Sequence, residues 1–151
     1  MAVVLVRHAS AGERSEWPAS DVERPLDAVG FGQAAALVPV IAALRPARLF
    51  SSPARRCMDT LRPAAAALGL PVEERDELFE GDVAPALALV RDLLAKGDTS
   101  VLCSHGDVIP AVLDSLSAND GLEGWLSTLR CGKGSAWVLD GRVARYIPTP
   151  D

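Results

Sequence analysis

Three short apolar runs separated by longer amphipathic segments limit the folds that this chain can adopt. Residues 2–6 read Ala-Val-Val-Leu-Val, residues 47–50 read Ala-Arg-Leu-Phe, and residues 99–103 read Thr-Ser-Val-Leu-Cys. Runs of this length that lack a regular polar alternation are typical of strands buried on both faces of a parallel sheet. Parallel strands need long crossover connections, which are usually helices. The sequence therefore predicts an α/β fold, a three-layer α/β/α sandwich with a mainly parallel central sheet.

The segments between these runs carry helix signals. Asp27 is a suitable N-cap for a helix that ends near residue 44. A second helix is expected from Pro53 to Gly69, a third closed by Gly97, and a fourth after residue 105. The residues expected to form the apolar stripe of the first helix, because they recur at helical spacing, are Phe31, Ala34, Val38 and Ile41.

The C-terminal segment has the pattern of a β-hairpin. Two apolar-rich stretches, residues 135–139 and 142–147, flank Asp140-Gly141, a pair that favours a type I′ turn. We expect this hairpin to add an antiparallel strand to one edge of the sheet. A chain of 151 residues suits one hydrophobic core, so residues 1–151 are expected to form a single domain.

The charge and apolar patterns exclude some classes of partner. Fifteen Lys and Arg residues against twenty Asp and Glu residues leave a net charge of −5, so we expect no nucleic-acid polymer as a partner. No stretch approaches the roughly 18 uninterrupted apolar residues of a membrane-spanning helix, and residues 2–6 are too short for a signal-peptide core. The three cysteines, Cys57, Cys103 and Cys131, form no CxxC pair, which favours reduced thiols and a cytoplasmic location.

Polar residues follow each of the three apolar runs. In open α/β sheets, ligands bind at the carboxyl ends of the strands, so these residues should meet at one edge. A cluster of cations repels itself unless an anion lies within it, and a phosphoryl group matches the planar fork of arginine. The predicted ligand is therefore a phosphate group, near the N-termini of two helices. The polar residues are Arg7-His8, Ser51-Ser52 with Arg55-Arg56, and Ser104-His105.

Two alternatives apply to these residues. Neighbouring helical positions point about 100° apart, so only one of Arg55 and Arg56 can easily face the pocket. A zinc site built from His8, Cys103 and His105 is a competing idea. These residues lack the usual paired-ligand spacing, and nearby arginines would repel a cation, so we expect no bound metal.

The same residues resemble the motifs of the histidine phosphatase superfamily, the phosphoglycerate-mutase-like enzymes. Residues 7–9 resemble its RHG or RHA signature, residues 51–60 its TSPxxRAxQT motif, and residues 104–106 its third motif. Residues 21–34 are similar to the D-x-x-RPL…G…QA pattern of the small SixA-type subgroup. Residues 132–139 resemble the closing strand of the phosphatase domain that follows a Nudix domain in some actinobacterial proteins.

The resemblance implies that His8 is a nucleophile that forms a transient phosphohistidine. It also implies that Arg7, Arg56 and His105 hold the phosphoryl oxygens, with protein cations in place of a metal and with no other cofactor. For the attack, the reacting nitrogen of His8 must be unprotonated. A hydrogen bond from its other nitrogen to a backbone carbonyl would establish this tautomer.

Family members that act on oxygen esters usually have a carboxylic acid that protonates the leaving group. Glu80 matches this pattern best, and Glu77 and Asp82 lie close to it in sequence. SixA-type enzymes can lack such an acid. Ser10 and Lys133 are further candidates for contact with the phosphate.

The sequence thus predicts a metal-independent phosphohydrolase, and the chain is too short for the lid segments of the mutases. Its partner would be a phosphohistidine protein or a small phosphorylated metabolite or nucleotide. An acid at Glu80 facing His8 would favour oxygen esters or anhydrides, whereas an open rim without it would favour protein phosphohistidine. A non-catalytic phosphate-binding or interaction module is the alternative. The long segment 9–25 is a candidate functional loop beside the site.

Overall fold

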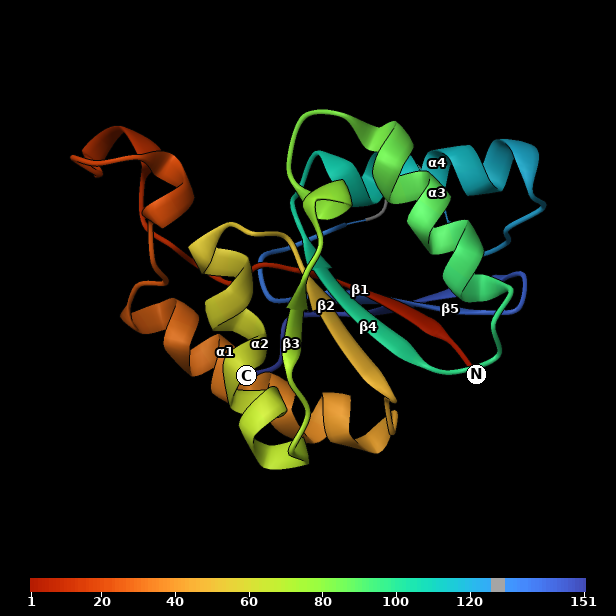
Figure 1. The fold of residues 1–151 in the computed structure, drawn as a ribbon, viewed down its shortest axis with the longest axis horizontal. Coiled ribbons are helices and arrows are strands. Elements are labelled where there is room, and N and C mark those ends of the chain that lie inside the picture. Colours follow the sequence, from red (N-terminus) through yellow and green to blue (C-terminus); the bar gives the residue numbers. More distant parts are fainter. Residues whose placement is uncertain (126–129) are drawn as a thin grey trace.

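The apolar runs of the sequence form the centre of a six-stranded sheet. The computed structural model describes residues 1–125 and 130–151, and its strands lie in the order β3-β2-β4-β1-β5-β6 (Figure 1). Strands β3, β2, β4 and β1 are parallel, β5 pairs with β1 antiparallel, and β6 pairs with β5 antiparallel. The predicted fold class and the antiparallel C-terminal hairpin are confirmed. The strands are β1 (Val3–Arg7), β2 (Arg48–Ser51), β3 (Val72–Glu74), β4 (Ser100–Ser104), β5 (Ala136–Asp140) and β6 (Val143–Ile147).

Helices cover both faces of the sheet. Figure 1 shows α1 and α2 on one side and α3 and α4 on the other. Within the described residues, no helix is long and apolar enough to cross a membrane. The helices are α1 (Ala28–Ala43), α2 (Arg55–Leu68), α3 (Val83–Leu94) and α4 (Val108–Asn119), and the short 3₁₀ turns are η1 (Arg14–Glu16), η2 (Asp21–Glu23) and η3 (Asp76–Leu78).

Alternate residues of β1 face opposite helical layers. Val4 and Val6 belong to the buried cluster that includes Leu37 of α1, whereas Val3 and Leu5 belong to the cluster formed with α3 and α4. Successive side chains of a strand point to opposite faces, so a strand covered on both sides needs apolar residues at every position. This explains why the run lacks polar alternation.

The apolar stripe predicted for α1 was partly wrong. Phe31 is 50% exposed, and the buried face of the helix begins one residue earlier, at Gly30. The first turn of α1 packs directly on the backbone of the preceding loop, which sets the rotation of the helix. The buried residues of α1 are Gly30, Ala34, Leu37 and Ile41.

The turn between β5 and β6 also differs from the prediction. Asp140 pairs with Val143, so Gly141 and Arg142 are the two central residues. A type I′ turn needs positive φ at both central residues. In the described part of the chain, Gly141 has φ 61° but Arg45 is the only non-glycine residue with positive φ. Glycine at the first central position is the pattern of a type II′ turn instead.

A close backbone contact joins α1 to the loop that follows β1. A Cβ atom on Gly30 would come within 1.9 Å of the carbonyl oxygen of Ser10, so only glycine allows this approach. The carboxylate of Asp27 caps Gly30 N at 2.8 Å and also accepts hydrogen bonds from Ser10 Oγ and Gly12 N. The start of the loop is therefore attached to the N-terminus of α1.

We expect Gly30→Ala to destabilise the protein by more than about 2 kcal/mol, because the added methyl group has to displace backbone atoms. Gly32→Ala is the matched control, since nothing lies within 4 Å of a Cβ at this exposed position of the same helix. That change should stabilise α1 by roughly 0.5–1 kcal/mol. Urea unfolding monitored by circular dichroism measures both, and equal effects of the two changes would contradict the packing described here.

Candidate active site

The carboxyl ends of three adjacent parallel strands bring the predicted polar residues together. Arg7 of β1 is in register with Ser104 of β4, and Ser51 of β2 is in register with Cys103. Backbone hydrogen bonds continue past the strands, because His8 N donates to Ser104 O at 3.1 Å. The alignment follows from the parallel pairing, which places equivalent ends of β2, β4 and β1 at one edge.

A cavity of about 400 Å³ opens at this edge. Its wall is rich in cations, and it includes six of the seven residues that the family resemblance marks as catalytic or phosphate-binding, namely Arg7, His8, Arg56, Glu80, His105 and Lys133. The seventh, Ser10, is not in the wall, because its hydroxyl donates to Asp27 Oδ2 at 2.8 Å. The lining residues are Arg7, His8, Gly12, Glu13, Arg14, Arg24, Arg56, Glu80, His105, Gly106, Asp107 and Lys133.

The His8 ring is held in one tautomer. Its Nδ1 lies 2.8 Å from the carbonyl oxygen of Ala9, which can only accept, so Nδ1 carries the proton and Nε2 has the free lone pair. Burial lowers the pKa of His8 to about 3, and the charges of Arg56, His105 and Arg7 act in the same direction. The ring therefore stays neutral at physiological pH, in the form that a nucleophile requires.

Thr60 connects the loop that carries His8 to α2. Its hydroxyl accepts a hydrogen bond from Ala9 N at 3.0 Å and donates to Arg56 O at 2.7 Å. The carbonyl that orients His8 belongs to Ala9, so Thr60 indirectly determines where the His8 ring lies. This gives a structural role to the threonine that closes the second sequence motif.

Arg56 is the buried centre of the site, with 1% of its surface exposed. Its guanidinium lies 3.2 Å from Asp21 Oδ2 and 3.3 Å from Glu80 Oε1. Arg55 is exposed and lies 3.6 Å from Asp59 instead. Only one of the two neighbouring arginines faces the cavity, as the helical geometry predicted.

Arg7 lies against the backbone of the third motif. Its Nη1 donates to Cys131 O at 2.7 Å. A Cβ atom on Gly106 would come within 2.7 Å of the Arg7 guanidinium, so a side chain at this position would displace the arginine. The glycine of Ser104-His105-Gly106 is therefore needed for the position of Arg7.

His105 is anchored from both ring nitrogens. Nε2 lies 2.8 Å from Ser52 Oγ, and Nδ1 lies 3.4 Å from Arg56 Nη2. These two contacts hold the ring in place beside the cavity. The ring centroids of His8 and His105 are 5.6 Å apart, which brings the two imidazoles of the chain together at one cavity.

Two carboxylates lie within the cationic cluster. Arg14 Nη2 lies 3.2 Å from Asp21 Oδ2 and 3.1 Å from Glu80 Oε1, so it links the two acids that also pair with Arg56. Partial burial acts to raise the pKa of Asp21, but the hydrogen bond from Arg24 and the nearby guanidinium charges hold it below its usual value. The anions expected within such a cluster are thus supplied in part by the chain itself.

The sequence did not identify Arg14, Asp21 or Arg24 as site residues. Arg14 begins the short 3₁₀ turn η1, and no local sequence pattern marks it as a site residue. Asp21 and Arg24 belong to the D-x-x-RPL pattern, which was the one available signal. Arg24 Nε lies 2.9 Å from Asp21 Oδ1, and Arg24 Nη1 donates to the carbonyl of Ala11 at 2.6 Å.

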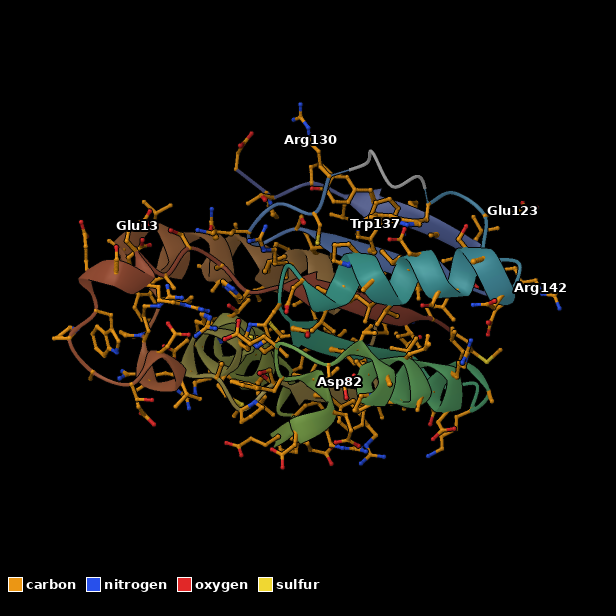
Figure 2. All side chains as sticks on the ribbon, turned by 90° about the horizontal axis from the view of Figure 1, so that it is seen from above. Glu13, Asp82, Glu123, Arg130, Trp137 and Arg142 are labelled. Atoms are coloured by element: carbon orange, nitrogen blue, oxygen red, sulfur yellow. The ribbon has the colours of Figure 1, made fainter. Side chains whose placement is uncertain are left out.

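The alternative acids lie away from the cavity. Glu77 pairs with Arg75, and Asp82 caps α3 by accepting from Ala84 N at 3.1 Å; Figure 2 shows Asp82 at the start of that helix. Neither lines the cavity, whereas Glu80 does.

His8, Cys103 and His105, the residues of the competing zinc-site hypothesis, do not form a metal site in the described part of the chain. Within residues 1–125 and 130–151, no three His, Cys, Asp or Glu side chains surround a position suited to a metal ion.

Known proteins resemble this chain in sequence. The chain matches the model of the histidine phosphatase superfamily (branch 1) over residues 3–86. It is 31% identical over 158 aligned residues to the 8-oxo-(d)GTP phosphatase of Mycolicibacterium smegmatis, an alignment that covers 99% of this chain. The chain spans about half the length of that curated relative, 48% of it.

Solved structures agree in fold. The putative phosphohistidine phosphatase SixA from Agrobacterium tumefaciens is 27% identical, with a TM-score of 0.77 and coverage of 97% of this chain and 94% of that chain. A protein histidine phosphatase SixA complexed with tungstate has the same TM-score and the same coverage at 22% identity, which shows a shared fold.

The low pKa of His8 predicts a pH-dependent loss of stability. The unfolded chain binds a proton at this histidine below its ordinary pKa of 6.5, whereas the folded protein does so only near 3, so stability falls as the pH decreases between these values. The slope approaches about 1.4 kcal/mol for each pH unit. His8→Gln should remove this component and flatten the curve. Urea unfolding at several pH values from 7 to 4 measures it, and parallel curves for the two proteins would refute the assignment.

Proposed function

The chain belongs to the histidine phosphatase superfamily, and on this premise we propose that it is a metal-independent phosphohydrolase that acts through a phosphohistidine on His8. One observation carries the proposal. The unprotonated Nε2 of His8 belongs to the same cavity as Arg7, Arg56 and His105, all of which can donate hydrogen bonds to phosphoryl oxygens. Such an arrangement suits in-line transfer of a phosphoryl group to nitrogen.

Two buried donors support the phosphate assignment. Within the described residues, Arg7 Nε and Arg56 Nε have no hydrogen-bond partner. A buried N–H group without an acceptor is unfavourable by about 1–3 kcal/mol, so binding of an anion rich in acceptor oxygens would relieve this penalty. A tetrahedral phosphoryl group offers three such oxygens to the guanidiniums.

In the first step, the lone pair of His8 Nε2 attacks phosphorus. The bond from phosphorus to the leaving oxygen breaks, and that oxygen takes the electron pair and a proton from the carboxyl group of Glu80. Arg7, Arg56 and His105 stabilise the charge on the equatorial oxygens.

In the second step, water attacks the phosphohistidine. The water proton passes to the Glu80 carboxylate, the N–P bond breaks, and its electron pair returns to Nε2. Inorganic phosphate leaves, and the cycle restores the protonated Glu80 and the neutral His8. Glu80 thus donates a proton to the leaving oxygen in the first step and accepts a proton from water in the second.

The position of Glu80 favours oxygen esters or anhydrides of a small phosphorylated metabolite or nucleotide. Its carboxylate lies 3.3 Å from Arg56 and 3.9 Å from His105 Nδ1, within the cavity that holds His8. The relative from Mycolicibacterium smegmatis, an 8-oxo-(d)GTP phosphatase, supports a nucleotide substrate. Likeness to SixA supports protein phosphohistidine as the second candidate.

Capture of the intermediate tests the proposal. After brief incubation with ³²P-labelled substrate and acid-free denaturation, the protein should carry label that is lost in acid and retained in base, as a phosphoramidate is. The same treatment should leave His8→Ala unlabelled, and turnover should persist in EDTA. Labelling of His8→Ala would refute the assignment of the nucleophile. A chain that binds phosphate but is never labelled would be a binding module instead.

Changing Glu80 to Gln should affect substrates according to their leaving group. The kcat/KM of nucleotides and alkyl phosphates, which reports the steps up to phosphoryl transfer to His8 and not the later hydrolysis, should fall about 10²–10⁴-fold, because loss of a general acid has this typical effect. The kcat/KM of p-nitrophenyl phosphate should fall much less, since its leaving group needs no proton. Glu77→Gln, a neighbouring acid paired with Arg75, is the control and should leave both rates unchanged. An equal fall for all substrates in Glu80→Gln would contradict proton donation.

A further inference from the structure

A second hollow lies directly beside the phosphate cavity. Its volume is about 230 Å³, and it shares Gly12, Glu13 and Arg24 with the wall of the first cavity. The remaining wall differs in character, because the indole of Trp17 and the side chains of Pro25 and Leu26 supply apolar surface. A molecule bound by its phosphoryl group in the cavity could therefore place a flat apolar group in this hollow.

The loop holds Trp17 in a defined position. Its Nε1 donates to the carbonyl of Ser20 at 2.9 Å, and the ring is half-buried. Arg24 ties the two ends of the loop together, because it bonds to the carbonyls of Ala11 and Gly12 and to the carboxylate of Asp21. The wall is thus organised before a ligand arrives, which reduces the entropy lost on binding.

The charge of the hollow excludes a second phosphate. Arg24 is its one cation among the described lining residues, and it is already bonded to Asp21 and to backbone carbonyls. Glu13 and Glu16 also line the hollow and are exposed; Figure 2 shows Glu13 on the loop, at the end of the molecule away from α4. Carboxylates accept hydrogen bonds only, so they suit a ring with N–H groups on its edge.

We propose that this hollow binds the base of a purine nucleotide, stacked on Trp17, while its phosphoryl group lies in the cavity at His8. The inference rests on the proposed phosphatase function and names the substrate class and a specificity-determining residue for it. A purine has a flat face for the indole and N–H groups for Glu13 and Glu16. A protein phosphohistidine offers neither feature.

Paired substrates test this inference. GMP and ribose 5-phosphate present the same 5′-phosphoryl group, but only GMP carries a base. Trp17→Ala should lower kcat/KM for GMP about 10- to 100-fold, the range that loss of base stacking on an aromatic ring predicts. It should leave kcat/KM for ribose 5-phosphate and the inhibition constant of inorganic phosphate unchanged. Trp17→Phe should restore most of the GMP activity, because phenylalanine retains an aromatic face.

Phe31→Ala is the matched control, because Phe31 is an exposed aromatic residue that lines neither hollow. It should leave both substrates unaffected. An equal loss for both substrates in Trp17→Ala would show that Trp17 only supports the loop, and a wild-type protein that does not prefer GMP would also overturn the inference. In either case the phosphatase proposal would stand. Failure to label His8 with any substrate would instead overturn the proposed function itself.

Discussion

The burial of one positive charge organises this site. Arg56 is almost fully enclosed, and a buried guanidinium is tolerated only when carboxylates and other acceptors surround it. Its partners are Asp21, Glu80 and His105, which come from three separate segments of the chain. The need to pair this charge therefore attaches the loop after β1 and the segment after η3 to the carboxyl edge of the sheet. The cavity is a consequence of these attachments.

The same surroundings keep the His8 ring neutral. Burial and nearby cations disfavour a proton on its ring, while the Ala9 carbonyl selects the tautomer with a free Nε2. Asp21 and Glu80 pair with Arg14 and Arg56 and so balance part of the guanidinium charge. A site with the guanidiniums alone would be strained by repulsion, whereas a fully neutralised site would hold a phosphoryl group poorly. The two carboxylates neutralise the positive charge of the cluster only in part, so its net charge lies between these two cases.

The candidate catalytic residues lie on rigid elements of the fold, whereas the residue proposed to recognise the base lies in a loop. His8, Arg56 and His105 lie just after the ends of strands or in the first turn of a helix, where the sheet and its covering helices hold their positions. Trp17 lies in the loop after β1, which Arg24 and Asp27 attach to the body of the molecule. Loops on a rigid scaffold commonly carry specificity. This division is consistent with the proposed phosphoryl transfer at the edge of the sheet and with the proposed recognition of the substrate by the loop.

The sequence by itself determined the layered sheet and the meeting of Arg7, His8, Arg56 and His105, because strand patterns and helical spacing are local and parallel pairing aligns strand ends. It could not give the rotation of α1, which exposes Phe31, since a contact between Gly30 and a distant backbone sets that rotation. The sequence also could not show that Arg14 and Asp21 belong to the site, or that the Ser10 hydroxyl bonds to Asp27 instead of facing the cavity. These placements depend on ion pairs and hydrogen bonds between segments remote in sequence, and only the folded chain brings such segments within reach.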